Sequence, residues 1–391
     1  MKSHDVIIVG AGPAGSTCAA NLRRSGFDVK LFDKKVFPRV KPCAGWVTPQ
    51  VVEALNIVVD DYRREHTFQP IYGFRTGMIG GRLVETKYEQ AVSYGILRVE
   101  FDHYLLQRSG VPCDYTPVKK IERAESQWIV NDNCTAAVVI GAGGHFCPVA
   151  RYVRDSQDSN GSSSRSGPPQ DAAAPAVVYA QEVEFEMSEK QRSSDRVDPA
   201  MPELYFCNDM KGYGWCFRKG NFLNVGLGRL DKTDLSTHVQ EFCDFLRSQE
   251  KLVDVLPSHF LGHAYQLYAT AQPQLFGDGV LLIGDSAGLA YAQSGEGIRP
   301  AVESAMIAAD VIANANGDYS ADALSVYRTR LFDRLGRPKP YQSFNWLPAA
   351  WLQAIAARLM ATRWFAKNVV VDNWFLHRQQ GTLAAFQSEA H

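Results

Sequence analysis

The clearest pattern of apolar positions lies at the N-terminus. Val6–Val9 is a short, β-branched apolar run, too short for a helix and typical of a buried strand. A glycine turn over residues 10–15 follows, and residues 16–25 then repeat apolar positions with a helical period. A second apolar run, Val29–Phe32, ends at Asp33. The order strand, glycine turn, helix, strand and acid predicts a βαβ unit.

The glycine turn has the G-x-G-x-x-G spacing of a dinucleotide site. The first glycine permits the tight turn, the second allows a pyrophosphate close to the backbone, and the third lets the helix pack on the sheet. The helix start offers N–H groups and a partial positive charge to the phosphates. The alternative is a plain turn that needs glycine only for packing. The residues that we assign to the cofactor here are Gly10, Gly12, Pro13, Ala14, Gly15, Asp33 and Lys34.

Asp33 argues against the plain turn and narrows the cofactor. It lies 18 residues after Gly15, where a carboxylate can accept hydrogen bonds from a ribose diol. The same negative charge would repel a 2′-phosphate on the adenosine. The site therefore favours FAD or NAD over NADP.

Two later strands also end in glycine turns. Residues 136–140 run into Gly141-Ala142-Gly143-Gly144, and residues 280–283 run into Gly284-Asp285. The second turn is followed by another glycine-rich loop and by a helix predicted over residues 299–313. Asp285 can accept from a ribityl or ribose hydroxyl, and the helix can point its positive end at a flavin carbonyl. From this stretch we assign Asp285, Gly295, Gly297 and Ile298 to the cofactor.

The middle of the chain predicts an antiparallel sheet. Tyr213, Trp215 and Phe217 alternate and so share one face of a strand. Such a face is more often plain core, but glycines between the aromatic residues favour a flat group lying close to it. Strands are expected over 67–95, 176–186 and 205–207, with a hairpin turn at 219–221.

Two segments have linker or tail character. Residues 155–171 have a Ser-, Asp- and Gly-rich composition, which predicts a weakly ordered crossing between domains. The tail, 331–391, is helical and rich in tryptophan, with arginine and lysine interleaved. A helical cap on the core is the favoured interpretation of the tail, and a membrane-surface helix is the alternative.

Three single residues leave alternatives open. Cys43 lies in a Pro- and Gly-rich loop over 34–49 that opens a helix at Thr48; taken alone it is more often inert than a cofactor neighbour. Arg98 precedes a helix, and two interpretations of it have equal weight: a ligand of a phosphate or ribose, or a partner in a surface salt bridge. His145, beside a glycine turn, is assigned a packing or capping role rather than a chemical one.

Composition and charge exclude several classes of protein. The 391 residues are 46% hydrophobic and 21% charged, which is typical of a globular chain of two domains, and a net charge of −1 gives no case for nucleic acid. We expect no signal peptide and no membrane-spanning helix, and therefore a cytoplasmic protein. The cysteines form no C-x-x-C pair and no cluster with histidine, so reduced thiols are expected and a metal site is not.

These features together resemble an FAD protein of the para-hydroxybenzoate-hydroxylase fold, and in detail the geranylgeranyl reductase family. The resemblance covers about residues 5–330. It is carried by Gly10–Gly15, by Lys41-Pro42-Cys43-Ala44-Gly45, by Tyr213-Gly214-Trp215-Cys216-Phe217, by Gly284-Asp285 with Gly295-Glu296-Gly297, and by Tyr94-Gly95 with Arg98 and Phe101-Asp102.

The resemblance implies an architecture. We expect a fold of the α/β plus α+β class, in which a Rossmann-type FAD-binding domain joins an antiparallel-sheet substrate domain and a C-terminal helical segment. The expected boundaries are 1–66, 96–172 and 266–330 for the FAD-binding domain, 67–95 and 173–265 for the substrate domain, and 331–391 for the C-terminal segment.

The resemblance also implies roles for residues. Cys43, Ala44 and Gly45 would lie beside the isoalloxazine ring, Tyr213 and Trp215 would shape the pocket across from it, and Arg98 would belong to the cofactor site. Cys43, Tyr213 and Trp215 are thus the candidate catalytic residues. Three positions depart from the family's pattern and bear on substrate and redox partner more than on the flavin: Gly143 for Asp, Arg218 for Pro and Ala44 for Gly.

The implied activity is reduction of C=C bonds in a hydrophobic, prenyl-like substrate by hydride from reduced FAD. Electrons would come from NAD(P)H or another external donor, and the C-terminal helices are the candidate contact with a membrane surface. Two rivals remain: a flavin-dependent monooxygenase or halogenase acting on an aromatic or lipid-like substrate, and a non-enzymatic flavin carrier or sensor. The strand at Tyr213 lacks the Trp-x-Trp-x-Ile-Pro pattern of tryptophan halogenases, which disfavours that branch.

Overall fold

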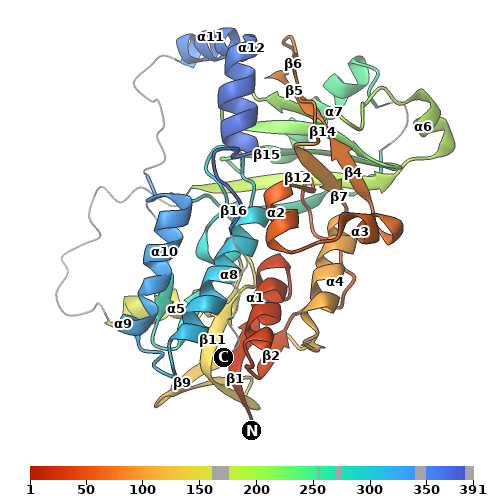
Figure 1. The fold of residues 1–391 in the computed structure, drawn as a ribbon. Helices are drawn as coiled ribbons and strands as arrows, with labels where there is room; N and C mark the ends of the chain where they lie inside the picture. The colour runs from red at the N-terminus through yellow and green to blue at the C-terminus, as the bar shows by residue number, and fades with distance from the viewer. Residues whose placement is uncertain (161–175, 253–255, 270–273, 340–348, 384–391) are drawn as a thin grey trace.

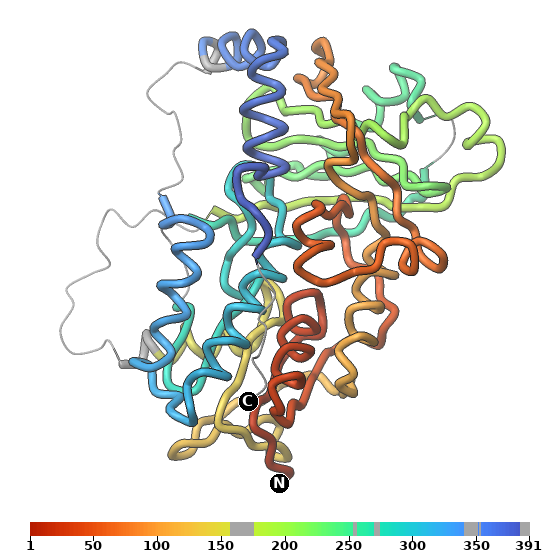
Figure 2. The backbone as a smooth tube through the Cα atoms, viewed as in Figure 1, coloured from red at the N-terminus to blue at the C-terminus, as the bar shows by residue number. Residues whose placement is uncertain are grey.

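The chain folds into two main sheets with a helical C-terminal segment beside them (Figure 1). Figure 2 shows the N-terminus at the far end of the first sheet's domain, away from the second sheet and from the last helices. The computed structural model describes residues 1–160, 176–252, 256–269, 274–339 and 349–383.

The first sheet is the predicted nucleotide-binding unit. Its central strands run parallel, with Val6 opposite Val138 on one side and opposite Val29 on the other. Both faces are covered, which is why these strands are continuous apolar runs rather than alternating ones. Its described strands are, along the sheet, β17 (Phe276–Gly277), β18 (Val280–Leu282), β11 (Cys134–Gly141), β1 (Lys2–Val9), β2 (Val29–Phe32) and β8 (Cys113–Asp114), with β9 (Ile121–Ala124) and β10 (Gln127–Val130) attached through β11.

Helices bury this sheet. α1 packs against both α4 and α8, and α8 is buried along nearly its whole length. Ala301, Ala305 and Ala308 of α8 are buried small residues, which allow a close approach to neighbouring elements. The helices of this layer are α1 (Pro13–Arg24), α4 (Arg98–Ser109), α5 (Pro148–Asn160), α8 (Ile298–Asn314), α9 (Ala321–Leu324) and α10 (Val326–Leu335).

The second sheet is largely antiparallel and carries the predicted aromatic face. One face packs on α7 (Leu235–Ser248) through residues such as Val183 and Phe242, and the other face carries Trp215 and Phe217. The predicted hairpin is confirmed, with Gly220 at φ 56° in its turn. The described strands are β16 (Leu261–Gln266), β12 (Val177–Glu186), β15 (Phe222–Arg229), β14 (Gly212–Lys219), β13 (Glu203–Phe206), β5 (Gly73–Met78) and β6 (Val84–Lys87).

A small third sheet joins the two larger ones. Its strand β7 leads directly into α4, and Trp46 of its strand β3 contacts Phe217 of the second sheet, with ring centroids 5.9 Å apart. The strands are β3 (Trp46–Val47), β7 (Ser93–Ile96) and β4 (Phe68–Ile71); nearby or separate short elements are α2 (Pro49–Ala54), α3 (Val59–Glu65), α6 (Glu189–Ser194) and η1 (Gly284–Ala287).

The C-terminal segment covers the aromatic face of the second sheet. Val370, Val371 and Phe375 are fully buried, and they share a hydrophobic core with Phe206 and Trp215. The favoured interpretation of the tail as a helical cap is therefore confirmed for this part, while Trp346 lies outside the described residues. The elements are α11 (Ala349–Met360), α12 (Arg363–Phe365) and the π-helix η2 (Ala366–Phe375).

The α/β plus α+β fold class is confirmed, and several local expectations are corrected. The linker predicted from residue 155 is wrong up to Asn160, because α5 continues to that residue; buried Val149 and Val153 anchor the helix before its polar end. The rest of that segment, 161–171, lies outside the described residues. Thr48 is the N-cap of α2 as predicted, but its hydroxyl makes no capping hydrogen bond.

Candidate functional site

A cavity of about 650 Å³ lies between the first sheet and the second. It extends from the glycine turn after β1 to the aromatic face of β14, and the loop after β2 forms one of its walls. Most of the predicted site residues line it. They are Gly12, Pro13, Ala14, Asp33, Lys34, Cys43, Ala44, Gly45, Arg98, Tyr213, Trp215, Asp285, Gly295, Gly297 and Ile298.

The three glycines of the first turn have different surroundings. A Cβ on Gly15 would lie 1.7 Å from the carbonyl oxygen of Gly10, and Gly10 itself has φ 113°. Both glycines are therefore required by the packing of the turn and are not on the cavity wall. A Cβ on Gly12 would meet one atom, Nη2 of Arg39 at 3.2 Å, so this glycine leaves open space at the cavity.

Asp33 is fixed at the edge of the cavity by the backbone. Its Oδ2 accepts from the N–H of Ala11 at 2.8 Å, and its Oδ1 accepts from the N–H of Lys35 at 2.9 Å. Each carboxylate oxygen has a second lone pair, so the group can still accept from a ligand hydroxyl.

Arg98 is a salt-bridge partner that also borders the cavity. Its guanidinium donates to both oxygens of Asp102, at 2.8 Å each, and the pair is buried. Arg39 approaches the same carboxylate at 3.2 Å and lies over the Phe37 ring, 4.5 Å from its centroid. Both arginines thus share one acid, and together they place a net positive charge beside Gly12.

Side chains from the second sheet hold the Cys43 loop. The N–H of Cys43 donates to Oε1 of Glu182 at 2.5 Å, and Nδ2 of Asn224 donates to the Cys43 carbonyl oxygen at 3.2 Å. Buried Lys219 donates to the carbonyl oxygen of Ala44 at 2.9 Å. Gly45 has φ 72°, and a Cβ there would lie 2.5 Å from the Ile96 oxygen. The loop is therefore held by the second sheet and, at Gly45, packs against the small third sheet.

Tyr213 and Trp215 form the aromatic wall of the cavity. The Tyr213 hydroxyl donates to the carbonyl oxygen of Ser294, and Nε1 of Trp215 donates to Oδ1 of Asn224 at 2.6 Å. The expectation that the interleaved glycines admit a flat ligand is wrong for Gly214, which makes room for the ring of Phe242 on the opposite face. On the neighbouring strand, Gly226 makes room for the Trp215 ring.

Asp285 lies in a half-buried group of charges. Lys41 Nζ lies 3.2 Å from its Oδ2, and His263 Nε2 lies 3.8 Å from the same oxygen. Burial alone would raise the pKa of Asp285, but the Lys41 ammonium and His263 hold it below its ordinary value. Burial and the same ammonium lower the pKa of His263. The site therefore holds Asp285 as a carboxylate.

The loop before α8 contains a second buried acid. Glu296 accepts from the N–H of Arg299 at 2.7 Å through Oε1, and its Oε2 has no hydrogen-bond partner among the described residues. Burial raises the pKa of this carboxyl from 4.5 to about 7. Part of the α8 N-terminus, expected to face a flavin carbonyl, is thus taken by this side chain.

Several cavity residues were not predicted from the sequence. Glu182, Arg39 and His263 are examples, and their partners lie far away along the chain. Glu182 had one usable signal: in β12 the positions on the cavity side read Val178, Ala180, Glu182 and Glu184, so acids stand where apolar residues would continue the pattern. His145, assigned to packing, lies at the cavity with its ring against Phe146.

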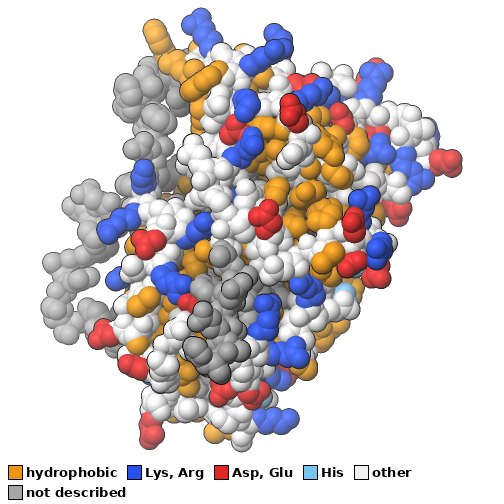
Figure 3. Space-filling model, in the orientation of Figure 1, with side chains coloured by type: hydrophobic (Ala, Val, Ile, Leu, Met, Phe, Trp, Pro, Cys, Tyr) orange, Lys and Arg blue, Asp and Glu red, His pale blue; other side chains and the backbone are white. Residues whose placement is uncertain are grey.

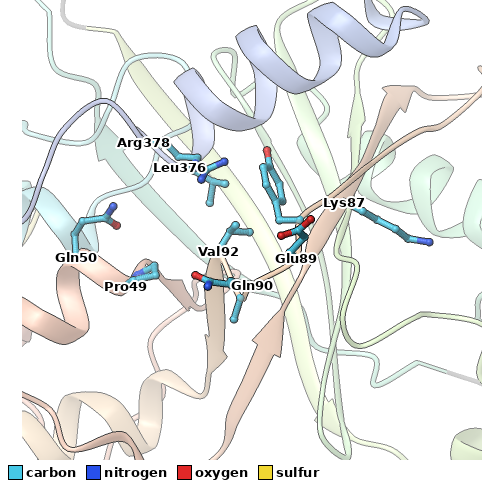
Figure 4. A pocket seen from close by; sticks show the side chains of 10 residues that line it. Pro49, Gln50, Lys87, Glu89, Gln90, Val92, Leu376 and Arg378 are labelled. Atoms are coloured by element: carbon cyan, nitrogen blue, oxygen red, sulfur yellow. The ribbon is translucent and has the colours of Figure 1, made fainter.

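A second cavity, of about 540 Å³, lies beside the C-terminal segment. Figure 4 shows Pro49 and Gln50 on one side, Leu376 and Arg378 above, and Lys87 extending away from the others. Next to it, the Tyr88 hydroxyl donates to Asp372 at 2.6 Å. This contact fixes η2 to the segment after β6. The lining of this second cavity contains no glycine turn like the one after β1.

The larger cavity fits FAD. Gly12 leaves open backbone at the start of α1, Arg39 and Arg98 supply positive charge, and Asp33 and Asp285 supply carboxylates along the cavity. No group of metal-ligating side chains exists within the described part of the chain. The cysteines found there are free thiols, as expected.

Comparisons with known proteins agree with this site. Residues 8–39 match the model of an NAD(P)-binding Rossmann-like domain. The chain is 26% identical to a digeranylgeranylglycerophospholipid reductase of Methanocaldococcus jannaschii, over 84% of this chain and 82% of that protein. It is 25% identical to a geranylgeranyl diphosphate reductase of Rhodobacter capsulatus, over 83% of this chain and 75% of that protein.

Solved structures show the same fold. A geranylgeranyl bacteriochlorophyll reductase-like protein of Thermoplasma acidophilum superposes with a TM-score of 0.70 at 21% identity, over 93% of this chain and 88% of that one. A flavin-dependent brominase and a halogenase solved in complex with FAD share the fold at lower identity.

The fold and the cavity define an FAD-dependent oxidoreductase with the para-hydroxybenzoate-hydroxylase fold. Within that class the chain is similar, at 25–26% identity, to proteins named as geranylgeranyl-type reductases. None of the helices in the described residues is long and apolar enough to cross a bilayer.

Proposed function

We propose that this protein reduces C=C bonds of a prenyl-like, hydrophobic substrate. The observation that carries the proposal is the position of Cys43–Gly45 and the Tyr213–Trp215 wall, which border the same cavity as the FAD turn. Relatives over more than four fifths of the chain bear the names of geranylgeranyl reductases, and this similarity supports the substrate class.

Different residues along the cavity would hold different parts of the cofactor. Gly12, Pro13 and Ala14, with Arg39, would hold the pyrophosphate, and Asp33 would accept from the ribose. The Cys43 loop and the loop at Gly295–Ile298 would hold the ring system between them. Bound FAD, once reduced, supplies hydride chemistry that no amino-acid side chain provides. The protein's part is to orient the substrate, exclude water and deliver a proton.

The aromatic wall suits an apolar substrate. Trp215 has its indole N–H satisfied internally by Asn224, and the Tyr213 hydroxyl is satisfied by Ser294, so both rings present carbon surface to the cavity. Buried rings with no free polar group favour an alkene chain over a polar substrate.

An external donor supplies the electrons in this proposal. The sequence contains one G-x-G-x-x-G fingerprint, which the FAD takes. NAD(P)H or a protein donor would therefore act without a second fingerprint. Reduction of the bound flavin by each donor, followed by its absorbance, separates these two sources.

We also propose that the C-terminal helices rest on an anionic lipid surface. Trp351, Ile355 and Leu359 repeat every four residues along α11 and are 67%, 44% and 43% exposed, and Trp364 of α12 is 69% exposed. Figure 3 shows hydrophobic and basic side chains together at this end of the molecule. Exposed apolar side chains on one helix face are typical of an interfacial helix.

The positive charge of this segment favours a lipid surface, rather than a second copy of the chain, as the partner of its exposed face. Between residues 334 and 371 the sequence contains no acid, and Arg358 and Arg363 stand exposed beside the tryptophans. A two-fold interface through this face would place these arginines against their own copies, whereas anionic headgroups neutralise them.

The test of the proposed reaction compares products with and without oxygen. A geranylgeranyl compound is added to the purified protein with FAD and a reductant, and the mass of the product is measured by mass spectrometry. The proposal expects addition of hydrogen across the double bonds without oxygen. Oxygen uptake stimulated by the substrate, with an oxygen atom in the product, would instead identify a monooxygenase.

A further inference from the structure

Glu182 stands out as an acid on the cavity side of the second sheet. Along β12, Tyr179, Val183 and Phe185 pack toward α7, and the alternate positions face the cavity. Glu182 is 5% exposed and lies opposite Gly226, whose own neighbour across the sheet is Trp215. The carboxyl is therefore buried between the aromatic wall and the Cys43 loop.

The hydrogen bonds of Glu182 distinguish its two oxygens. Oε1 accepts from the N–H of Cys43 at 2.5 Å, which fixes the carboxyl plane. Oε2 is buried and makes no hydrogen bond with any described residue. The nearby amide of Asn224 donates to Cys43 and to Glu184, so both of its hydrogens are in use. An unpaired, buried oxygen is most stable when it carries a proton.

The charges around Glu182 agree with a protonated state. Burial raises the pKa of Glu182 from 4.5 to about 7; the Glu184 carboxylate adds to the rise, while the Cys43 N–H, Lys219 and Asn224 oppose it. Lys219 does not neutralise Glu182 fully, because its ammonium is paired with Glu184. On the far side of the cavity, Lys41, His263 and Asp285 form their own group. Near neutral pH the carboxyl thus holds a proton that it can give up.

Other acidic groups at the cavity differ from Glu182 in state or in place. The Tyr213 hydroxyl donates to Ser294, and burial raises its pKa. The Lys41 ammonium and His263 hold the pKa of Asp285 below its ordinary value. Glu296 resembles Glu182, with one oxygen held by the Arg299 N–H and Oε2 unpaired, but it lies in the loop before α8. Among these acids, Glu182 is the one on the sheet that carries the aromatic wall.

We propose that Glu182, whose side chain borders the cavity, is the catalytic proton donor of the reduction through its carboxyl group. This inference rests on the proposed function. Bound FAD, when reduced, would supply a hydride with its electron pair to one alkene carbon and be oxidised in turn. The O–H bond of the Glu182 carboxyl would break as a C–H bond forms at the other carbon. Glu182 would be left as a carboxylate, and a proton from water would restore the acid before the next turnover.

The test compares Glu182→Gln with Glu186→Gln, a matched variant at the exposed end of the same strand. A glutamine keeps an acceptor for the Cys43 N–H but has no acidic proton. We expect the single-turnover rate of alkene reduction to fall about 100-fold or more in Glu182→Gln, with FAD binding and flavin reduction unchanged. The Glu186→Gln variant should behave like the unaltered protein.

A second readout needs no turnover. Infrared spectra of the protein without substrate should contain protonated-carboxyl absorption that titrates near pH 7. Part of this absorption should be lost in Glu182→Gln, and the part that remains belongs to Glu296. The rate in the unaltered protein should fall as pH rises through the same range, and Glu182→Asp should shift the pH at which the rate falls. Equal rates in Glu182→Gln and the unaltered protein, or carboxyl absorption of undiminished intensity in the variant, would overturn the proposal. An unaltered protein that reduces no alkene would overturn the proposed function itself.

Discussion

Lys219 of β14 and Ala44 of the Cys43 loop are joined by a buried hydrogen bond of 2.9 Å, although 175 residues separate them. The same ammonium donates to the Ile96 oxygen at 3.0 Å and is paired with Glu184. Its side chain is fully buried. One lysine thus connects the substrate sheet, the small third sheet and the loop expected beside the flavin.

Replacing Lys219 with methionine should destabilise the protein by about 3–5 kcal/mol, because Glu184 and two carbonyl oxygens would lose their partner inside the protein. Thermal unfolding of the FAD-free protein measures the loss. Lys211→Met is the control, since Lys211 is exposed and its partner Asp231 is partly exposed and keeps Arg229 as a second partner. A loss no larger than that of the control would mean that the Lys219 contacts add little to stability.

Alanine substitutions at two glycines of the first turn should have different effects, one on stability and the other on FAD affinity. In Gly15→Ala the new Cβ meets backbone at 1.7 Å, so the FAD-free protein should be strongly destabilised. In Gly12→Ala the new Cβ meets one flexible arginine atom at 3.2 Å, so the melting temperature without FAD should barely change. FAD affinity should nevertheless fall at least about tenfold, because the methyl occupies the path of the phosphates. Titration with FAD and thermal unfolding check both outcomes, and a Gly12→Ala variant with unchanged affinity would move the pyrophosphate elsewhere.

The stability of the FAD-free protein should depend on pH through Glu182. Its folded pKa of about 7 is above the unfolded value of 4.5, so the folded state retains a proton that the unfolded state has lost. The contribution of Glu182 to stability is therefore greatest below about pH 4.5 and is lost as pH rises through 7. The difference between its folded and unfolded pKa values corresponds to about 3 kcal/mol of folding free energy.

Unfolding midpoints measured from pH 5 to 8 in Glu182→Gln and in the unaltered protein check this. The stability of the variant should fall less steeply between pH 5 and 8 than that of the unaltered protein. The fall that remains belongs to Glu296, because burial also raises the pKa of that carboxyl to about 7. Identical pH dependence in the two proteins would show that Glu182 ionises normally.

Vesicle binding tests the C-terminal surface. The protein should sediment with vesicles that contain phosphatidylglycerol more than with pure phosphatidylcholine, and added salt should weaken the binding. Trp351→Ala with Trp364→Ala, and Arg358→Ser with Arg363→Ser, should each reduce it severalfold. The control pair Arg63→Ser and Arg64→Ser removes exposed arginines from α3 and should not. Self-association that these variants abolish, without lipid binding, would identify the face as a dimer contact.

The sequence predicts the parts of this protein that local patterns determine. The β1 turn, the hairpin at Gly220 and the shared face of Tyr213 and Trp215 follow from glycine spacing and from period-two alternation, and the structure confirms them. The assignment of domain boundaries stays a prediction.

What the sequence does not predict depends on contacts across long chain separations. Glu182 meets Cys43 across 139 residues, and Lys41 meets Asp285 across 244. No local pattern relates such residues, so Glu182 looked like one polar position in a strand. Gly214 is misleading for the same reason: Phe242 of α7 fills the space beside it, a contact that spacing alone does not reveal.

A single turnover without oxygen tests most directly whether the protein reduces alkenes. The flavin of the purified protein is reduced chemically, the excess reductant is removed, and a geranylgeranyl compound is added while the flavin absorbance is followed. The flavin should be reoxidised with one saturated bond formed per flavin, and it should stay reduced with the fully saturated analogue. A flavin that stays reduced with every prenyl compound, yet is reoxidised at once by oxygen and an aromatic substrate, would contradict this prediction.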